Sequence, residues 1–89
     1  MEDKMYYIQN SGYIGNAMVW WREGGKGYTS DITDAGIFSE AEMQSIIDNR
    51  PEDDYAWECD YIDNNPEIRK TIIESQKIDF EKQIKGKRK

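Results

Sequence analysis

The stretch Phe38–Met43 contains the most restrictive local signal in the chain. Ser39 is followed three residues later by Glu42, the spacing of a capping box, in which each side chain accepts a hydrogen bond from the other residue's backbone N–H at a helix start. The apolar residues at the two ends of this stretch are placed to pack together as a hydrophobic staple. Apolar residues then repeat at helical spacing, and Pro51 predicts that the helix ends near 48–50. The rest of the chain must therefore cover the apolar side of a helix of about ten residues.

The chain before this helix has the composition of short β-strands separated by turns. Met5–Gln9 and Ala17–Arg22 are rich in aromatic and branched residues, whereas residues 10–16 between them are rich in turn formers. Glu23–Gly25 is typical of a hairpin turn and predicts a return strand at Lys26–Ile32.

The chain after the helix predicts one more strand and a second helix. Glu52–Asp54 is interpreted as a solvated, charged loop, and the alternation of residues over Tyr55–Tyr61 predicts a half-buried strand. Asn65 followed by Pro66 is a helix start, which predicts a C-terminal helix over residues 66–85 and a basic tail over 86–89. The expected fold is α+β, with a small antiparallel sheet of three or four strands and two helices packed on one face, in a single domain spanning residues 1–89.

Charge argues against nucleic acid as a partner, and the lack of a long apolar stretch argues against a membrane. Residues 1–65 carry 14 acidic and 4 basic side chains, and the net charge of the whole chain is −6. Such an acidic surface disfavours contact with phosphate backbones, so no sequence-specific binding of nucleic acid is expected. No stretch approaches the ~20 apolar residues of a membrane span, and the acidic N-terminus is unlike a signal peptide, so we expect no membrane association.

The residue types that most enzymes use for catalysis are scarce. The chain has no histidine, which removes the usual general base and histidine-based metal sites. Its one cysteine, Cys59, lies among carboxylates that raise a thiol pKa, so we interpret it as a packing residue. We therefore expect no catalytic residues, no metal site and no cofactor, and a protein that is not an enzyme.

A candidate binding site lies in the aromatic and glycine-rich stretch of residues 13–38. The side chains expected to contact a ligand combine aromatic faces for stacking with cationic and hydrogen-bonding groups. They are Tyr13, Asn16, Trp20, Arg22, Lys26, Tyr28, Thr29 and Asp31.

Trp20 and Trp21 must point to opposite faces of their strand. If Trp21 packs inward, Trp20 and Arg22 line an outward face beside a glycine turn and form part of a site. Alternatively, both tryptophans belong mainly to the core because a helix covers the second face. The sequence leaves both interpretations open.

The first half of the chain contains the pattern Tyr7-Ile8-Gln9-Asn10, Gly12-Tyr13, Gly15-Asn16, Trp20-Trp21, Gly25-Lys26-Gly27-Tyr28-Thr29, Asp31, Ala35-Gly36, Phe38 and Glu40. This pattern resembles that of a family of small, mostly uncharacterised bacteriophage and prophage proteins. The resemblance covers roughly residues 5–45. Residues 1–4 precede the usual start of such proteins, which leaves Met1 and Met5 as alternative starts.

The resemblance implies a phage accessory protein in the cytoplasm of an infected bacterium. Such proteins often oppose host defences by binding. Our leading hypothesis is that a homo-oligomer of this chain sequesters a nucleotide-type immune signal. Alternatives are a protein–protein inhibitor of a host defence enzyme, a DNA mimic and a structural phage protein.

Overall fold

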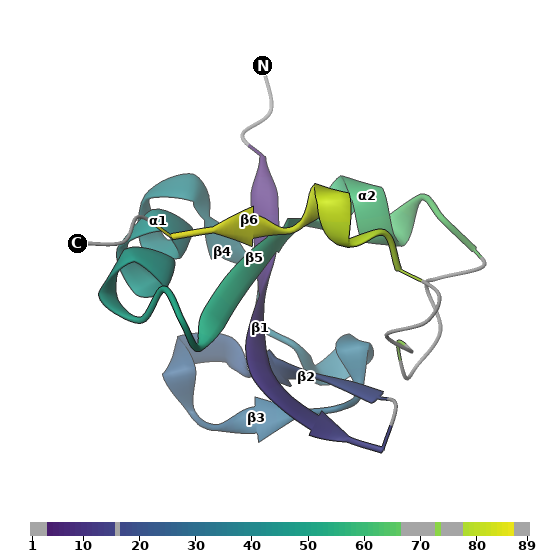
Figure 1. Ribbon diagram of the computed structural model, residues 1–89. Helices are drawn as coiled ribbons and strands as arrows, with labels where there is room; N and C mark the ends of the chain where they lie inside the picture. Colours follow the sequence, from purple (N-terminus) through teal and green to yellow (C-terminus); the bar gives the residue numbers. More distant parts are fainter. Residues whose placement is uncertain (1–3, 16, 67–72, 74–77, 87–89) are drawn as a thin grey trace.

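The computed structural model describes residues 4–15, 17–66, 73 and 78–86. Its elements in chain order are β1 (Met5–Ile14), β2 (Ala17–Trp21), a 3-10 turn (Glu23–Gly25), β3 (Tyr28–Thr29), a 3-10 turn (Ile32–Asp34), β4 (Phe38–Ser39), α1 (Glu40–Asn49), β5 (Asp54–Glu58), α2 (Cys59–Asp63), a 3-10 turn (Phe80–Lys82) and β6 (Ile84–Lys85). The strands form one antiparallel sheet in the order β3-β2-β1-β5-β6, and β4 pairs with the start of β1 (Figure 1).

The predicted α+β class is confirmed, but the sheet has six strands rather than three or four. The additional pairings come from two-residue strands, β4 and β6, whose sequences carry no alternating pattern long enough to indicate a strand. In the described part of the chain, no helix is long and apolar enough to cross a membrane.

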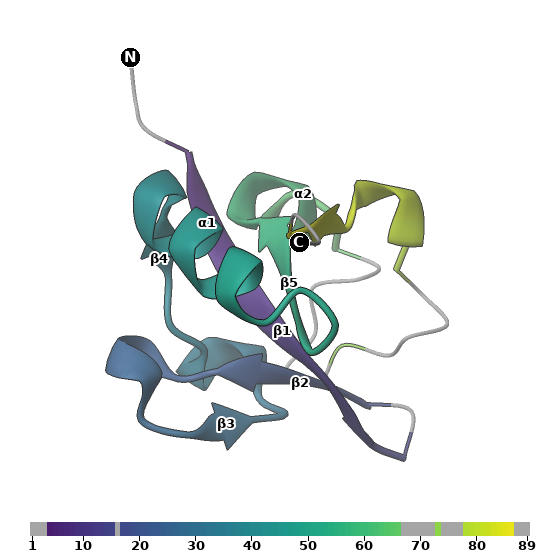
Figure 2. The same ribbon diagram turned by 60° about the vertical axis from the view of Figure 1, so that its left-hand side comes forward.

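The two helices cover opposite faces of the sheet, not one face as predicted. In Figure 2, α1 lies in front of β1 and α2 lies behind it. Successive residues of β1 accordingly enter different cores, with Tyr6 and Ile8 on the α1 face and Tyr7 on the α2 face. Because both faces of the central strand are covered, Tyr6, Tyr7 and Ile8 are all buried.

The capping box and the start of α1 are confirmed. The Glu42 N–H donates to Ser39 Oγ at 3.3 Å, and the Ser39 N–H donates to Glu42 Oε1 at 3.2 Å. The helix ends at Asn49. Phe38 and Met43, the predicted staple, are buried in the same cluster on the α1 face.

The strand expected at Lys26–Ile32 is reduced to Tyr28–Thr29. On its N-terminal side Gly27 has a φ of +100°, a conformation that interrupts an extended strand. On its C-terminal side the Asp31 N–H donates to Thr29 Oγ1, and Asp31 Oδ1 accepts the Thr33 N–H that begins the next 3-10 turn. These side-chain hydrogen bonds replace further pairing in the sheet.

Two further elements differ from the predictions. The strand expected over 55–61 ends at Glu58, because Cys59 begins α2 and places Cys59 and Ile62 together in the α2-face core. The C-terminal helix expected over 66–85 is absent from residues 78–86, which instead form a 3-10 turn and β6. Residues 67–72 and 74–77 of that expected helix, and residues 87–89 of the expected basic tail, lie outside the described residues.

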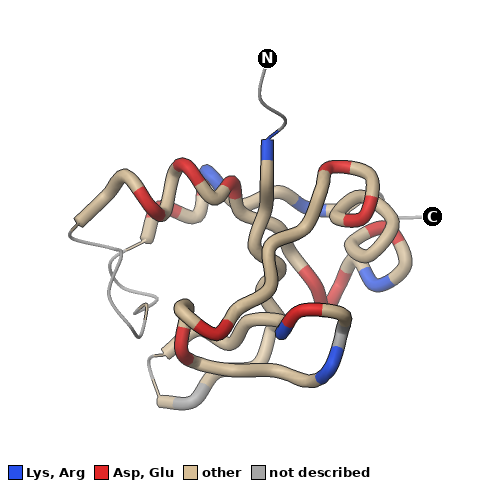
Figure 3. The backbone as a smooth tube through the Cα atoms, turned by 180° about the vertical axis from the view of Figure 1, so that it is seen from behind, with Lys and Arg blue, Asp and Glu red and all other residues tan. Residues whose placement is uncertain are grey.

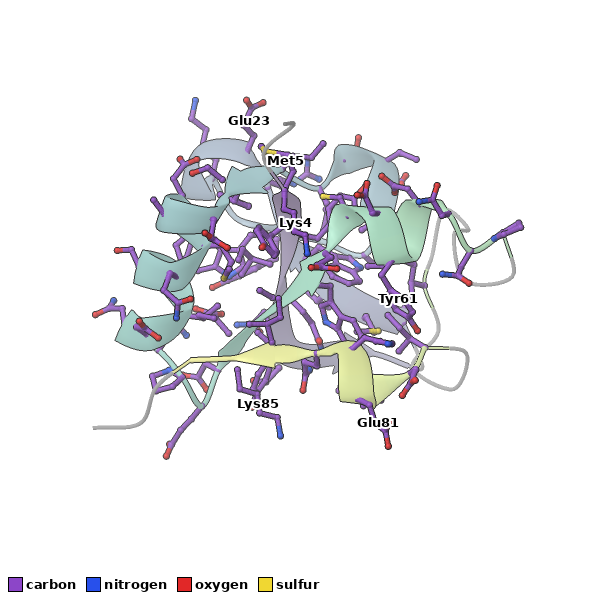
Figure 4. The ribbon with its side chains drawn as sticks, turned by 90° about the horizontal axis from the view of Figure 1, so that it is seen from above. Lys4, Met5, Glu23, Tyr61, Glu81 and Lys85 are labelled. Carbon is purple, nitrogen blue, oxygen red and sulfur yellow. The ribbon has the colours of Figure 1, made fainter. Side chains whose placement is uncertain are left out.

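The segment 78–86 returns across the sheet and closes its edge beside β5. The side chain of Gln83 donates to Gln9 Oε1 at 3.0 Å, while Glu81 and Lys85 point away from the sheet (Figure 4). Gly86 lies so close to α1 that a Cβ there would be 2.1 Å from the carbonyl oxygen of Ile47. Glycine at this position therefore permits a close approach of two backbones and does not end a helix.

Candidate functional site

A groove opens on the α1 face where the end of β2 meets the second half of the helix. It has a volume of about 430 Å³ and is open to solvent. We call it the Trp21 groove, and its lining residues are Trp21 from β2 and Ser45, Ile46, Asp48 and Asn49 from α1. The helical residues lie within about one turn of each other, so a hydroxyl, a carboxylate and an amide from α1 line the same groove as the indole.

The indole of Trp21 is held in one orientation by two rings. Tyr28 and Phe38 both meet it edge to face, with ring centroids 6.0 Å and 6.4 Å away and interplanar angles of 83°. Trp21 is half-buried, so part of the ring remains available to the groove. This arrangement provides a fixed aromatic surface.

The polar edge of the indole binds a buried carboxylate. Trp21 Nε1–H donates to Asp54 Oδ1 at 3.1 Å, and Asn10 Nδ2 donates to the same oxygen at 3.2 Å. The Asp54 side chain has 0% of its surface exposed, so the interpretation of Glu52–Asp54 as a solvated loop was wrong for its last residue. Asp54 pairs with Asn10 across β1 and β5, which brings the carboxylate beneath the indole.

A guanidinium lies next to the groove lining, because Arg50 follows Asn49 in the chain and contacts the carboxylate that binds Trp21. Arg50 follows the last residue of α1, and its Nε is 3.7 Å from Asp54 Oδ2. Its terminal nitrogens reach Asp53 Oδ2 at 3.4 Å and the Tyr28 hydroxyl at 3.5 Å. The groove thus has an aromatic ring and hydrogen-bonding groups in its lining and a cation beside it.

The eight side chains predicted to form a site are divided by the fold. Arg22 and Tyr28 lie at the groove end of the sheet, where Arg22 Nε donates to the carbonyl oxygen of Tyr28 at 3.4 Å. Tyr28 is 45% exposed, and Lys26 is also exposed in the connection that precedes β3. Thr29 and Asp31 form the local turn described above.

The remaining three predicted residues do not join this group. Trp20 is 0% exposed and lies in the α2-face core, edge to face with Tyr7 at 5.9 Å, so the outward placement of Trp20 was wrong. Tyr13 is 46% exposed but pairs with Met18, near the opposite end of β2 from Trp21. Asn16 lies outside the described residues.

Sequence reasoning missed Trp21, Asp54 and the groove residues of α1. Alternation did place the two tryptophans on opposite faces of the sheet. It could not show which of the two covered faces leaves its tryptophan partly accessible to solvent. The burial of Asp54 depends on Arg50, four residues earlier, and on Asn10 and Trp21, which are distant in the sequence. No local pattern could have indicated this contact.

The one thiol is not available for chemistry. Burial, together with a smaller effect of the nearby carboxylates of Asp63 and Asp60, raises the pKa of Cys59 to about 12. The sequence-based interpretation of Cys59 as a buried packing residue is confirmed. A thiol with such a pKa stays protonated at neutral pH.

Acidic side chains occur along most of the backbone and outnumber basic ones (Figure 3). Even so, the described residues contain no group of three or more Asp, Glu or Cys side chains that could hold a metal ion. Comparison of the chain with protein-family models, with curated protein sequences and with solved structures finds no significant match.

Proposed function

We propose that this protein acts by binding a nucleotide-type small molecule in the Trp21 groove, without catalysing a reaction. The observation that carries the proposal is a groove lined by the Trp21 ring and the polar side of α1, with the Arg50 guanidinium next to that lining. Its volume of about 430 Å³ lies within the range of small-molecule sites.

Each part of the groove suits one part of a nucleotide. An aromatic base stacks on or packs against the Trp21 indole. Ser45, Asp48 and Asn49 provide acceptors and donors for base edges or ribose hydroxyls. Arg50 provides a planar cation for a phosphate.

The chemistry of the side chains supports binding rather than catalysis. The chain has no imidazole, and the Cys59 thiol is protonated and buried. The carboxylate nearest the indole, Asp54, is fully buried and already bound to Trp21 and Asn10. Neither group is placed to attack a ligand.

In the phage setting that the sequence resemblance implies, tight binding of a nucleotide would lower the free concentration of a host immune signal. A sponge of this kind needs affinity and abundance but no turnover. We therefore retain sequestration as the biological role of the groove.

A protein partner is the second candidate. The groove is open, and the exposed ring of Tyr28 lies beside Trp21, an arrangement that also accepts an anchoring side chain of another protein. Under this alternative the chain inhibits a host defence enzyme by covering it.

Thermal unfolding in the presence of a ligand panel tests the proposal. The panel contains nucleosides, nucleoside monophosphates, cyclic mono- and dinucleotides and ADP-ribose derivatives. A ligand at 100 times its Kd stabilises the folded state by about 2.7 kcal/mol, which is roughly 10 °C or more for a domain of this size. A panel in which no compound raises Tm would reject the proposal and leave the protein partner.

A matched pair of variants locates the binding. Ser45→Tyr places a large neutral side chain in the groove, whereas Ala41→Tyr places the same side chain one helical turn earlier, outside the lining. Both positions are exposed, so neither change disturbs the core. We expect Ser45→Tyr to abolish the Tm shift and Ala41→Tyr to retain it; equal shifts in the two variants would place the ligand elsewhere.

A further inference from the structure

Arg50 is surrounded by three oxygen partners, and none of them is at the distance of a strong charge-assisted hydrogen bond. The contacts to Asp53, the Tyr28 hydroxyl and Asp54 measure 3.4, 3.5 and 3.7 Å. Strong pairs between a guanidinium and an oxyanion are about 2.7–2.9 Å long. The guanidinium is therefore placed among acceptors without being tightly bound by any of them.

The three contacts differ in how readily they can be exchanged. Asp54 is fully buried, and its Oδ2 has no hydrogen bond from the described residues, so Arg50 Nε is the positive charge that compensates it. Asp53 is 55% exposed and the Tyr28 hydroxyl contact is also exposed, so water can replace either one at little cost. The inner edge of the guanidinium is anchored and the two terminal nitrogens are exchangeable.

We infer that the terminal nitrogens of Arg50 form the phosphate-binding fork of the Trp21 groove, and that Asp53 competes with the ligand's phosphate for this fork. The inference rests on the proposed function. Nε stays against Asp54 while the two terminal nitrogens leave Asp53 and Tyr28 and bind two oxygens of one phosphate. Arg50 is thereby the residue that distinguishes a nucleotide from its nucleoside.

The surroundings of Arg50 favour this assignment. Tyr28 lies between two guanidinium groups, since Arg22 donates to its carbonyl oxygen and Arg50 to its hydroxyl. Two guanidinium groups therefore lie on the Tyr28 side of Trp21, where Asp53 and Asp54 also face Arg50, whereas Asp48 lies in the groove lining formed by α1. A phosphate is expected on the Tyr28 side and hydroxyl or amino groups are expected near Asp48.

The test compares nucleosides with their 5′-monophosphates by isothermal titration calorimetry in about 0.15 M salt, where exposed charges beyond about 8 Å are largely screened. Adenosine, guanosine, cytidine and uridine are each paired with their monophosphate. For the base that binds best, the ratio of the two affinities isolates the contribution of the phosphate. In the unmodified protein we expect this ratio to be roughly tenfold or more.

Three variants then report on the fork. Arg50→Lys keeps the charge but loses the planar pair of donors, and should reduce the ratio to about two- or threefold. Asp53→Asn removes the competing carboxylate and should raise the ratio about two- to fivefold. Glu52→Gln is the matched control, because it removes the same charge from the neighbouring exposed residue; its side chain makes no contact with Arg50 among the described interactions.

The outcomes separate this inference from the proposed function. If nucleosides and nucleotides bind equally well, the groove binds the base and the phosphate fork is refuted. If Asp53→Asn and Glu52→Gln raise the ratio by the same factor, the effect is general charge and Asp53 is not a competitor, which also refutes the inference. If neither member of any pair binds, the inference is refuted, because a phosphate-binding fork should bind a 5′-monophosphate; the proposed function is then decided separately by the thermal panel with its cyclic nucleotides and ADP-ribose derivatives.

Discussion

Replacing Asp54 with asparagine removes a charge from a fully buried side chain while keeping its shape. In the native protein, Oδ1 accepts hydrogen bonds from Trp21 and Asn10, and Oδ2 faces the Arg50 guanidinium. An amide has one acceptor oxygen and one donor nitrogen, so it cannot satisfy both sides. If its oxygen stays toward Trp21, its NH₂ faces a cation; if it turns over, its NH₂ faces two other donors.

The size of the effect follows from these contacts. A buried donor left without an acceptor costs about 1–3 kcal/mol. Removing one partner of a fully buried ion pair costs about 3–5 kcal/mol, but the Arg50 side chain is 43% exposed and water compensates part of that loss. We therefore expect Asp54→Asn to lower the free energy of unfolding by about 2–3 kcal/mol, a large share of the roughly 4–13 kcal/mol typical of a chain of this length.

The assay is urea denaturation followed by tryptophan fluorescence and by circular dichroism. The midpoint should decrease while the m value stays constant, because the folded state keeps the same buried surface. Asp53→Asn is the matched control: it removes the same charge from the adjacent exposed residue and should change stability by no more than about 0.5 kcal/mol. An Asp54→Asn protein as stable as the unmodified one would refute the buried carboxylate as the group that holds Trp21 and Arg50 in place.

Two further substitutions and one labelling experiment test the fold. Gly86→Ala places a Cβ 2.1 Å from the Ile47 carbonyl oxygen, so backbone atoms must move. It should lower the free energy of unfolding by about 1–3 kcal/mol in urea denaturation, and an unchanged midpoint would contradict the docking of residue 86 on α1. Ser39→Ala removes the capping hydrogen bond to Glu42 and should cost about 1 kcal/mol by the same measurement, and no loss would show that the cap is dispensable. Cys59, whose pKa burial raises to about 12, should react with a disulfide reagent at pH 8 only after denaturation, and fast labelling of the native protein would contradict its burial.

The start of α1 could be predicted from the sequence because its determinants lie within six residues. Ser39 and Glu42 satisfy each other's backbone groups without help from any other part of the chain. The alternation in β2 was equally local and separated Trp20 from Trp21 correctly. These patterns depend only on backbone geometry and on neighbouring side chains.

The placement of the site depended on tertiary contacts and could not be predicted in the same way. Two-sided burial was nevertheless visible in one place: Tyr6, Tyr7 and Ile8 are three consecutive large residues, which is typical of a strand covered on both faces. That signal argues against an outward Trp20 on the neighbouring strand. Over residues 78–86, by contrast, pairing of β6 with β5 overrides the apolar spacing that suggested a helix.

The two adjacent tryptophans therefore have different roles because the sheet is covered on both faces. Trp20 is sealed in the α2-face core, whereas Trp21 lies where α1 ends and the sheet extends beyond it. The elements that carry the groove are a helix with a firm cap and the strands β2 and β5, joined at Asp54. Under the proposed function and the inference drawn from it, binding rearranges only the terminal nitrogens of Arg50, so we expect a small ordering cost on association. A preformed groove of this kind suits a protein whose action consists in holding its ligand.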